Sequence, residues 1–335
     1  MKVDAVLTGE KGDWDRAADA EQAGYDGVWL PEISHDPFPM LALAADRTES
    51  ITVGTAVAVA FARNPMSLAT TANDLQTYSG GRFILALGSQ VKTHVTERFS
   101  MPWSAPAERM REYICAIRAI WRSWETGEPL DFRGEYYTHT VMPPFFNPGP
   151  NAHGNPPVML AGVGPRMTEV AGEMADGFMA HGFTTQRYLR EVTVPALQRG
   201  RSSAGGLSDY EICGFPFVVT GENDFQRRVA ELAVRAQIAF YASTPGYRPV
   251  LERHGWESIG DDLHAKSKCG DWRDMVDLVT DDMLHEFAIV AEPEHVARRV
   301  RERFGGIYTR TGFYAPYPMP KGFWDPIAAE LSSGL

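Results

Sequence analysis

Short apolar runs alternate with amphipathic helical stretches along most of the chain. The first run is followed by a helical stretch over 13–23, where Asp13 or Gly12 can cap the start and Gly24 can end it. Glycines and prolines separate the later runs from the helical stretches in the same way. Eight runs are predicted as strands, and in chain order they are Val3–Leu7, Gly27–Leu30, Ile51–Ala60, Phe83–Leu87, Val158–Ala161, Gly177–Ala180, Glu211–Val219 and Phe287–Val290.

This order of elements predicts the fold class. The predicted strands are nearly continuous in apolar residues, which is typical of parallel strands covered on both faces. A strand followed by a helix, repeated eight times, predicts an α/β protein with a (β/α)8 TIM barrel. The alternative is a doubly wound sheet, which is disfavoured because no GxGxxG sequence follows the first strand.

The chain is longer than a plain barrel needs. It has 335 residues, whereas a TIM barrel takes about 250. Two insertions are predicted, about 126–156 before strand 5 and about 244–285 before strand 8, within a single domain over 1–335. The first insertion carries aromatic side chains that could cover an apolar substrate, form a dimer surface or pack the insertion itself: Phe132, Tyr136, Tyr137, Phe145 and Phe146.

Composition narrows the classes of partner. The net charge is −11, from 32 basic and 43 acidic residues, and no basic stripe is present, so nucleic acid is not expected to bind. No apolar run reaches the roughly 18 residues of a membrane span, and no signal-peptide segment is visible, so we expect a cytoplasmic protein without a membrane partner. The three cysteines lie far apart without a CxxC pair, which disfavours zinc and disulfides.

Functional residues of a barrel lie where the strands end at their carboxyl side. Neither a metal-type cluster of His and carboxylates nor a Gly-x-Ser-x-Gly sequence occurs at these ends, so no metal is expected. Small residues, backbone amides and aromatic rings predominate instead, and these suit a flat ligand. The strand ends are Thr8, Glu32, His35, Phe61–Arg63, Gly88–Gln90, Lys92, Gly162–Gly164, Arg166, His181–Phe183, Phe215 and Pro216.

A glycine-rich segment, Ala161–Thr168, joins the fifth predicted strand to its helix. Glycine lets the backbone approach an anion closely, and a helix N-terminus offers free N–H groups and the positive end of its dipole. Arg166 adds a formal charge nearby. A tight strand-to-helix turn would need the same glycines, so this segment alone does not decide between the two interpretations.

Several segments together resemble the luciferase-like monooxygenase superfamily, and most closely its branch of F420-dependent oxidoreductases. The resemblance covers nearly the whole chain. It rests on the segments AGYDGVWLPEISHDPF, ITVGTAVAVAFARNPMSLA, SGGRFILALGSQVK, FSMPWSAPAERMREY, LDFRGEYYTHTVMPPFF and VMLAGVGPRMTEVAGEMADGF.

The resemblance implies a barrel whose open end holds a flavin or its deazaflavin analogue, coenzyme F420. It implies a bulged third strand, with a non-prolyl cis peptide bond between Ala56 and Val57, behind the cofactor ring. By the same comparison Glu32 contacts the ring, and His181 approaches it from the other side. The remaining implied cofactor contacts are Gly162, Val163 and Gly164 with Arg166 at the phosphate, and Ser89 and Gln90 along the ring and side chain.

One departure from the relatives affects the chemistry. F420-dependent sugar dehydrogenases of this superfamily carry a proton-donating glutamate just after strand four, where this chain has Val91. Their substrate and proton relay are therefore not transferred. His35 is the best remaining candidate for proton transfer, because its ordinary pKa lies near neutrality. A surface role for His35 and a purely structural role for Glu32 stay open.

Three functions follow from these observations. The first is an F420-dependent oxidoreductase that transfers a hydride between C5 of the deazaflavin and a small organic substrate. The second is an FMN-dependent monooxygenase, which would need reduced flavin from a partner reductase because no nicotinamide site is recognisable. The third is a non-catalytic cofactor-binding protein, which the absent glutamate keeps open. The resemblance also implies a homodimer.

Overall fold

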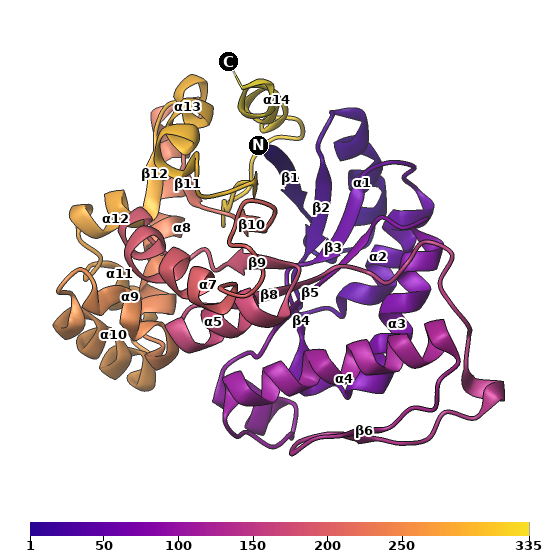
Figure 1. Ribbon diagram of the computed structural model, residues 1–335. Helices are drawn as coiled ribbons and strands as arrows, with labels where there is room; N and C mark the ends of the chain where they lie inside the picture. The colour runs from indigo at the N-terminus through magenta and orange to yellow at the C-terminus, as the bar shows by residue number, and fades with distance from the viewer. Residues whose placement is uncertain (335) are drawn as a thin grey trace.

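The computed structural model describes residues 1–334 and confirms the predicted barrel. Eight parallel strands form a ring, which closes where β3 pairs with β5 (Figure 1). Their order along the chain is β1 (Lys2–Val6), β2 (Gly27–Leu30), β3 (Thr52–Thr55), β5 (Phe83–Gly88), β8 (Val158–Gly162), β9 (Gly177–Ala180), β10 (Glu211–Gly214) and β13 (Arg310–Thr311).

Helices surround this ring and cover its outer face (Figure 1). Several begin at a side-chain cap, as at Asn64, which accepts a hydrogen bond from the Ser67 N–H group, and at Asn223, which accepts one from Gln226. No helix within 1–334 has both the length and the apolar composition that crossing a membrane requires. The outer helices are α1 (Asp13–Gln22), α2 (Pro37–Asp46), α3 (Pro65–Tyr78), α4 (Pro106–Thr126), α5 (Pro165–Met174), α7 (Val194–Gly200), α8 (Asp224–Ala242), α13 (Pro293–Phe304) and α14 (Asp325–Ser333).

Side chains alternate between the two faces of each barrel strand. On β2, Val28 and Leu30 join the large core between strands and helices, whereas Trp29 points into the barrel. A separate cluster fills the barrel interior, so the barrel is packed and not a pore. Its buried members are Trp29, Ile84, Ala86, Met159, Met179 and Cys213.

The prediction of the eighth barrel strand was wrong. The run at Phe287–Val290 forms β12 (Ala288–Val290), which pairs with β11 (Phe217–Val219) in a separate two-stranded sheet. The barrel closes instead through β13, which is only two residues long and pairs with both β1 and β10. A search for apolar runs overlooks β13 because one of its two residues is a charged arginine.

The predicted seventh strand is also divided. Its run at Glu211–Val219 forms β10 inside the barrel and β11 outside it, separated by Phe215 and Pro216. The second insertion therefore belongs to a longer excursion between β10 and β13. This excursion has a core of its own, in which α8, β11 and β12 pack together. Its short helices are α9 (Arg248–Glu252), α10 (Glu257–Cys269), α11 (Trp272–Val276) and α12 (Asp281–Phe287).

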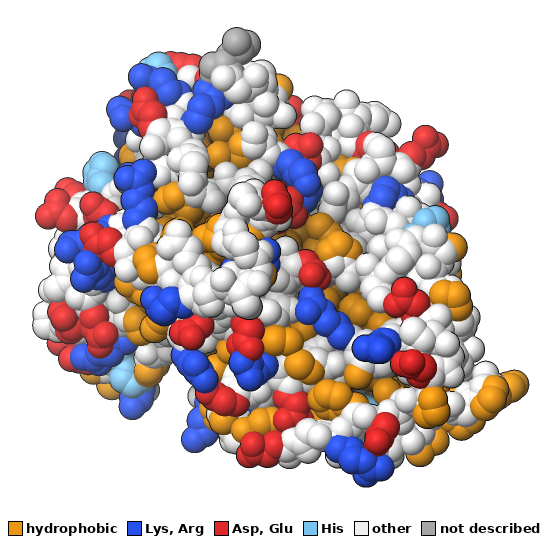
Figure 2. All heavy atoms as spheres, viewed as in Figure 1, with side chains coloured by type: hydrophobic (Ala, Val, Ile, Leu, Met, Phe, Trp, Pro, Cys, Tyr) orange, Lys and Arg blue, Asp and Glu red, His pale blue; other side chains and the backbone are white. Residues whose placement is uncertain are grey.

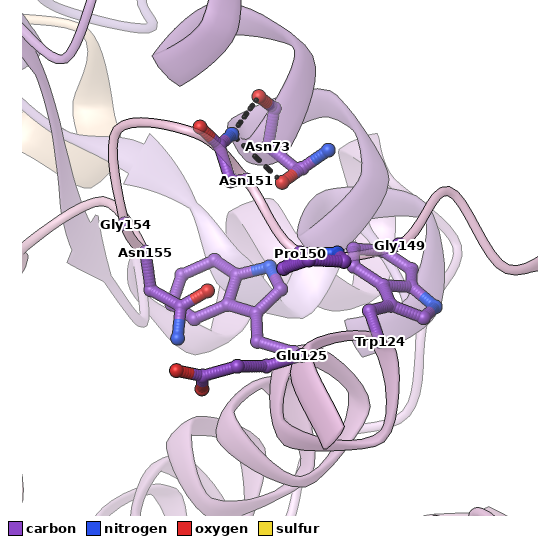
Figure 3. A pocket seen from close by; sticks show the side chains of 9 residues that line it. Asn73, Trp124, Glu125, Gly149, Pro150, Asn151, Gly154 and Asn155 are labelled. Carbon is purple, nitrogen blue, oxygen red and sulfur yellow. Dashed lines mark hydrogen bonds between the residues drawn. The ribbon is translucent and has the colours of Figure 1, made fainter. Parts of the chain in front are cut away.

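The first insertion contains a small hairpin of β6 (Phe132–Arg133) and β7 (Thr138–His139), and it lies along α3 and α4. The Glu112 carboxylate of α4 accepts hydrogen bonds from three consecutive backbone N–H groups, those of residues 135–137. Farther along, the Asn151 amide donates to Asn73 of α3, at 2.9 Å from its side-chain oxygen (Figure 3). These contacts favour the packing role for this insertion over a cover for the strand ends.

Two aromatic residues of this insertion do not take part in that packing. Phe145 is 92% exposed and Phe146 is 69% exposed. Figure 2 shows hydrophobic side chains gathered at the lower right, where Figure 1 draws the segment between β7 and β8.

A buried ion pair joins the first and last strands of the barrel. Arg310 Nε lies 2.6 Å from Asp4 Oδ2, and both side chains are at most 1% exposed. Burial raises the pKa of the Asp4 carboxyl, and the Arg310 guanidinium opposes this rise. Only glycine fits beside the pair at position 27, because a Cβ there would lie 2.6 Å from Asp4 Oδ1.

Replacing Arg310 by Met is expected to lower the free energy of unfolding by about 3–5 kcal/mol, because Asp4 is then left buried without its counter-charge. Denaturant unfolding followed by circular dichroism measures this loss. The double variant Asp4→Leu/Arg310→Met removes both charges and should recover most of the stability. A loss below about 1 kcal/mol in Arg310→Met would contradict the role of this pair.

Candidate active site

The open end of the barrel has a floor of mostly small apolar residues. Ala56, Val57, Ala161 and Phe215 are partly buried and pack on top of the cluster that fills the barrel interior. They lie at or just beyond the carboxyl ends of β3, β8 and β10. A flat ring could rest on this floor, because only Phe215 among these side chains is large.

The third strand is interrupted as predicted. It ends at Thr55, continues as β4 (Ala58–Val59), and contains the expected cis peptide bond between Ala56 and Val57. Val57 lies against Gly88 at the end of β5, and a Cβ on Gly88 would be 2.6 Å from Val57 Cγ2. Glycine at position 88 therefore makes room for the bulged segment.

One wall of this open end is built around Glu32. Its carboxylate accepts a 2.7 Å hydrogen bond from the Val59 N–H group and pairs with Arg63 Nη1 at 2.6 Å. Arg63 also pairs with Asp36 at 2.9 Å. Glu32 thus fixes the segment that follows the bulge, so its structural role has direct support, while a contact with a cofactor ring stays a prediction.

The two residues predicted to be catalytic share one cleft. It has a volume of about 340 Å³ and is lined by both Glu32 and His35, together with Arg63, Arg98 and Phe99. His35 is exposed, and its side chain lies against Gly9, where a Cβ would be 3.1 Å from the Cβ of His35. The structure therefore leaves His35 accessible to a ligand in the cleft.

The glycine segment between β8 and α5 presents an open helix N-terminus. Gly164 is the N-cap residue, no side chain caps the helix, and a Cβ on Gly164 would meet nothing within 4 Å. An anion can therefore reach the backbone N–H groups here. Arg166 is not a free charge, because it pairs with Glu108 of α4 at 3.2 Å.

Ser89 and Gln90 form a tight turn at the end of β5. Gln90 has a left-handed backbone with φ of 61°. Its side-chain oxygen accepts a 2.9 Å hydrogen bond from the Val91 N–H group, and the Ser89 hydroxyl donates to the Gln90 carbonyl at 3.1 Å. Both side chains serve the turn itself, and their contacts with a cofactor stay predictions.

The opposite wall is built around His181. This residue follows β9, two positions after the inward-facing Met179, so it points toward the barrel axis. Its ring stacks on Tyr247 with centroids 4.6 Å apart, and its Nε2 lies 3.2 Å from the Tyr247 hydroxyl. The Phe183 N–H group donates to His181 Nδ1 at 3.0 Å. Burial lowers the pKa of His181 to about 4.

Sequence reasoning missed two contributors to these walls. Arg63 appeared among the strand ends, yet its pairing with Glu32 could not be foreseen without the path of the chain after β4. Tyr247 comes from the second insertion, which has no regular pattern that points a side chain at the barrel. Within residues 1–334, no group of three His, Cys, Asp or Glu side chains could hold a metal ion.

The depressed pKa of His181 predicts an acid-sensitive contribution to stability. The group binds its proton near pH 6.5 when unfolded and near pH 4 when folded, so the unfolded chain takes up the proton first as the pH falls. This contribution is present above pH 6.5 and is lost toward pH 4, by about 3 kcal/mol. Urea unfolding of wild type and His181→Phe at pH 7 and pH 4 tests this. Equal pH dependence in both proteins would contradict it.

Known protein sequences include relatives that match most of this chain. An uncharacterized protein of Mycobacterium tuberculosis is 49% identical over 300 residues, covering 88% of this chain and 88% of its own. The 5,10-methylenetetrahydromethanopterin reductase of Archaeoglobus fulgidus is 27% identical over 292 residues, covering 84% of this chain and 83% of its own.

Solved structures share the fold at low sequence identity. The coenzyme F420-dependent tetrahydromethanopterin reductase of Methanopyrus kandleri matches with a TM-score of 0.80 and 20% identity, covering 99% of both chains. An F420-dependent secondary alcohol dehydrogenase, solved with an F420–acetone adduct, matches with a TM-score of 0.74 and 20% identity, also covering 99% of both chains. An FMN complex of the oxygenating constituent of 3,6-diketocamphane monooxygenase from Pseudomonas putida matches with a TM-score of 0.65 and 18% identity, covering 98% of this chain and 94% of that one.

The model of the family described as luciferase-like monooxygenase matches residues 14–310. This range runs from α1 to the first residue of β13 and includes both walls and the floor of the open barrel end. The chain therefore belongs to the luciferase-like monooxygenase family.

Proposed function

We propose that the protein is an F420-dependent oxidoreductase that transfers a hydride between the deazaflavin and a small organic substrate. Support comes from the reductase of Archaeoglobus fulgidus, whose similarity spans 84% of this chain, and from the fold shared with two F420-dependent enzymes. The observation that carries the proposal is the bulged segment at Ala56 and Val57, which lies on Gly88 as the floor of an open barrel end.

The residues at this end fit such a cofactor. The floor is apolar and mostly made of small side chains, and Gly164 leaves open space in front of the α5 N-terminus, where a phosphate can meet backbone N–H groups. When bound, the deazaflavin supplies or accepts a hydride at C5. In this proposal Gly162, Val163 and Gly164 hold the phosphate, and Arg166 adds positive charge that it shares with Glu108.

The walls complete the proposed site. Glu32 holds the bulged segment under the ring, and Ser89 and Gln90 shape the edge beside it. His35 lies in the cleft next to Glu32, and in this proposal its exposed imidazole transfers a proton to or from the substrate. In this proposal His181, which follows β9 on the opposite side of the barrel, approaches the ring from the other side, and its stacked ring with Tyr247 keeps water away.

Binding of the two cofactors tests this function directly. F420 and FMN are titrated separately into the purified protein, and binding is followed by quenching of their fluorescence. We expect F420 to bind and FMN to bind more weakly. Once F420 binds, His35→Ala should slow cofactor oxidation or reduction while leaving F420 affinity unchanged.

Tight FMN binding without F420 binding would overturn the proposal and favour a monooxygenase. F420 binding with no acceptor accelerating oxidation of the bound, reduced cofactor would instead indicate a non-catalytic binding protein.

A negative charge at the phosphate position should weaken F420 binding. Gly164→Asp introduces a carboxylate in front of the α5 N-terminus, where it competes for the N–H groups and repels the anionic cofactor, so the Kd should rise about tenfold or more. Asn223→Asp is the matched control, because it adds the same charge at the N-cap of α8. Equal F420 affinity in wild type and Gly164→Asp would show that the phosphate binds elsewhere.

A further inference from the structure

The hydrogen bonds around His181 determine which of its ring nitrogens carries a proton. The backbone N–H group of Phe183 can only donate, and it points at Nδ1 from 3.0 Å. Nδ1 must therefore be the unprotonated nitrogen of a neutral ring. The proton of the neutral ring lies on Nε2, which is 3.2 Å from the Tyr247 hydroxyl oxygen. Nε2 thus donates to that oxygen.

This arrangement leaves the hydroxyl hydrogen of Tyr247 without an acceptor. Its oxygen already accepts the bond from His181, and among residues 1–334 no second partner of the Tyr247 hydroxyl is present. The neighbouring Tyr241 hydroxyl is engaged with Tyr314 at 2.9 Å. The free O–H of Tyr247 is therefore available to a ligand.

Tyr247 is positioned over the open end of the barrel. Its ring is held by stacking on His181 and by an edge contact with Tyr241, at 5.5 Å between centroids. The preceding residue, Gly246, lies next to Val91 beyond the end of β5, where a Cβ on the glycine would be 4.0 Å from Val91 Cγ1. The segment therefore reaches from the end of β9 to the end of β5, across the glycine segment that follows β8.

We propose that the Tyr247 hydroxyl donates a hydrogen bond to the carbonyl oxygen or imine nitrogen of an uncharged substrate, with His181 as its positioning residue. This inference rests on the proposed function, because it places the substrate above the cofactor floor. A donor at this place stabilises negative charge that develops on the substrate heteroatom during reduction. The preceding residue, Gly246, lies next to Val91, so this part of the site has the uncharged Tyr247 hydroxyl and no carboxylic acid at position 91.

The wall is suited to a neutral ligand. Burial lowers the pKa of His181 and raises the pKa of Tyr247, so both side chains are uncharged near pH 7. Burial likewise raises the pKa of Tyr241 and of Tyr314. A charged substrate group would lose its hydration at this wall without meeting an opposite charge, whereas a carbonyl or imine needs only one donor.

Infrared spectroscopy of a bound ketone tests the donor. The protein saturated with oxidised F420 is mixed with acetone, chosen because it is the smallest ketone, and its C=O stretch is recorded. We expect a shift to lower frequency in wild type that is lost in Tyr247→Phe, which keeps the stacked ring. Tyr210→Phe is the control. Tyr210 lies just before β10, and its buried hydroxyl donates to the Ala171 carbonyl of α5, away from the proposed site. No shift in wild type, or the same shift in Tyr247→Phe, would overturn the proposal.

A second measurement separates this inference from the proposed function. Nitrogen NMR of histidine-labelled protein without cofactor should show His181 with Nδ1 unprotonated and Nε2 protonated at pH 7, with the signal assigned by its loss in His181→Phe. A protonated Nδ1 would overturn the positioning role even if F420 binds. Conversely, failure to bind F420 would remove the proposed function while leaving this result intact. Unchanged F420 affinity in Tyr247→Phe is expected, because the hydroxyl contacts substrate and not the cofactor.

Discussion

The ion pair between Asp4 and Arg310 is the contact on which the arrangement of the open end depends. It lies in the barrel interior, and it joins β1 to β13, the short strand that completes the ring. All eight strand ends take their places around one centre only when this ring is closed. The floor on which we place the cofactor therefore relies on charges at the far end of the same strands.

Above the closed ring, each wall of the open end is held by its own contacts. Glu32 and Arg63 tie β2 to the segment after the bulge, and Gly88 at the end of β5 leaves room for Val57. On the other side, the Phe183 N–H group sets the orientation of His181, which in turn holds Tyr247. Polar contacts with the protein backbone thus orient the two walls, while the floor between them stays apolar and small.

The sequence predicted most of the barrel, because seven of its strands overlap apolar runs and the helices between them begin and end at recognisable residues. It failed at β13, whose arginine is buried through a pairing that no local pattern reveals. The barrel prediction placed the site at the strand ends, which include Glu32 and His181, but the role of each residue and the Ala56–Val57 bond came only from the family resemblance. Tyr247 was beyond reach, since its place depends on how an irregular insertion folds back over the barrel. Arg166 was named, but its pairing with Glu108 requires the packing of α5 on α4.

The excursion between β10 and β13 packs around a second hydrophobic core, distinct from the cluster inside the barrel. Tyr247 packs against that second core. The protein is therefore modular: mutations in the excursion are expected to alter the wall where we place the substrate, while the cluster inside the barrel, under the proposed cofactor floor, keeps its own packing.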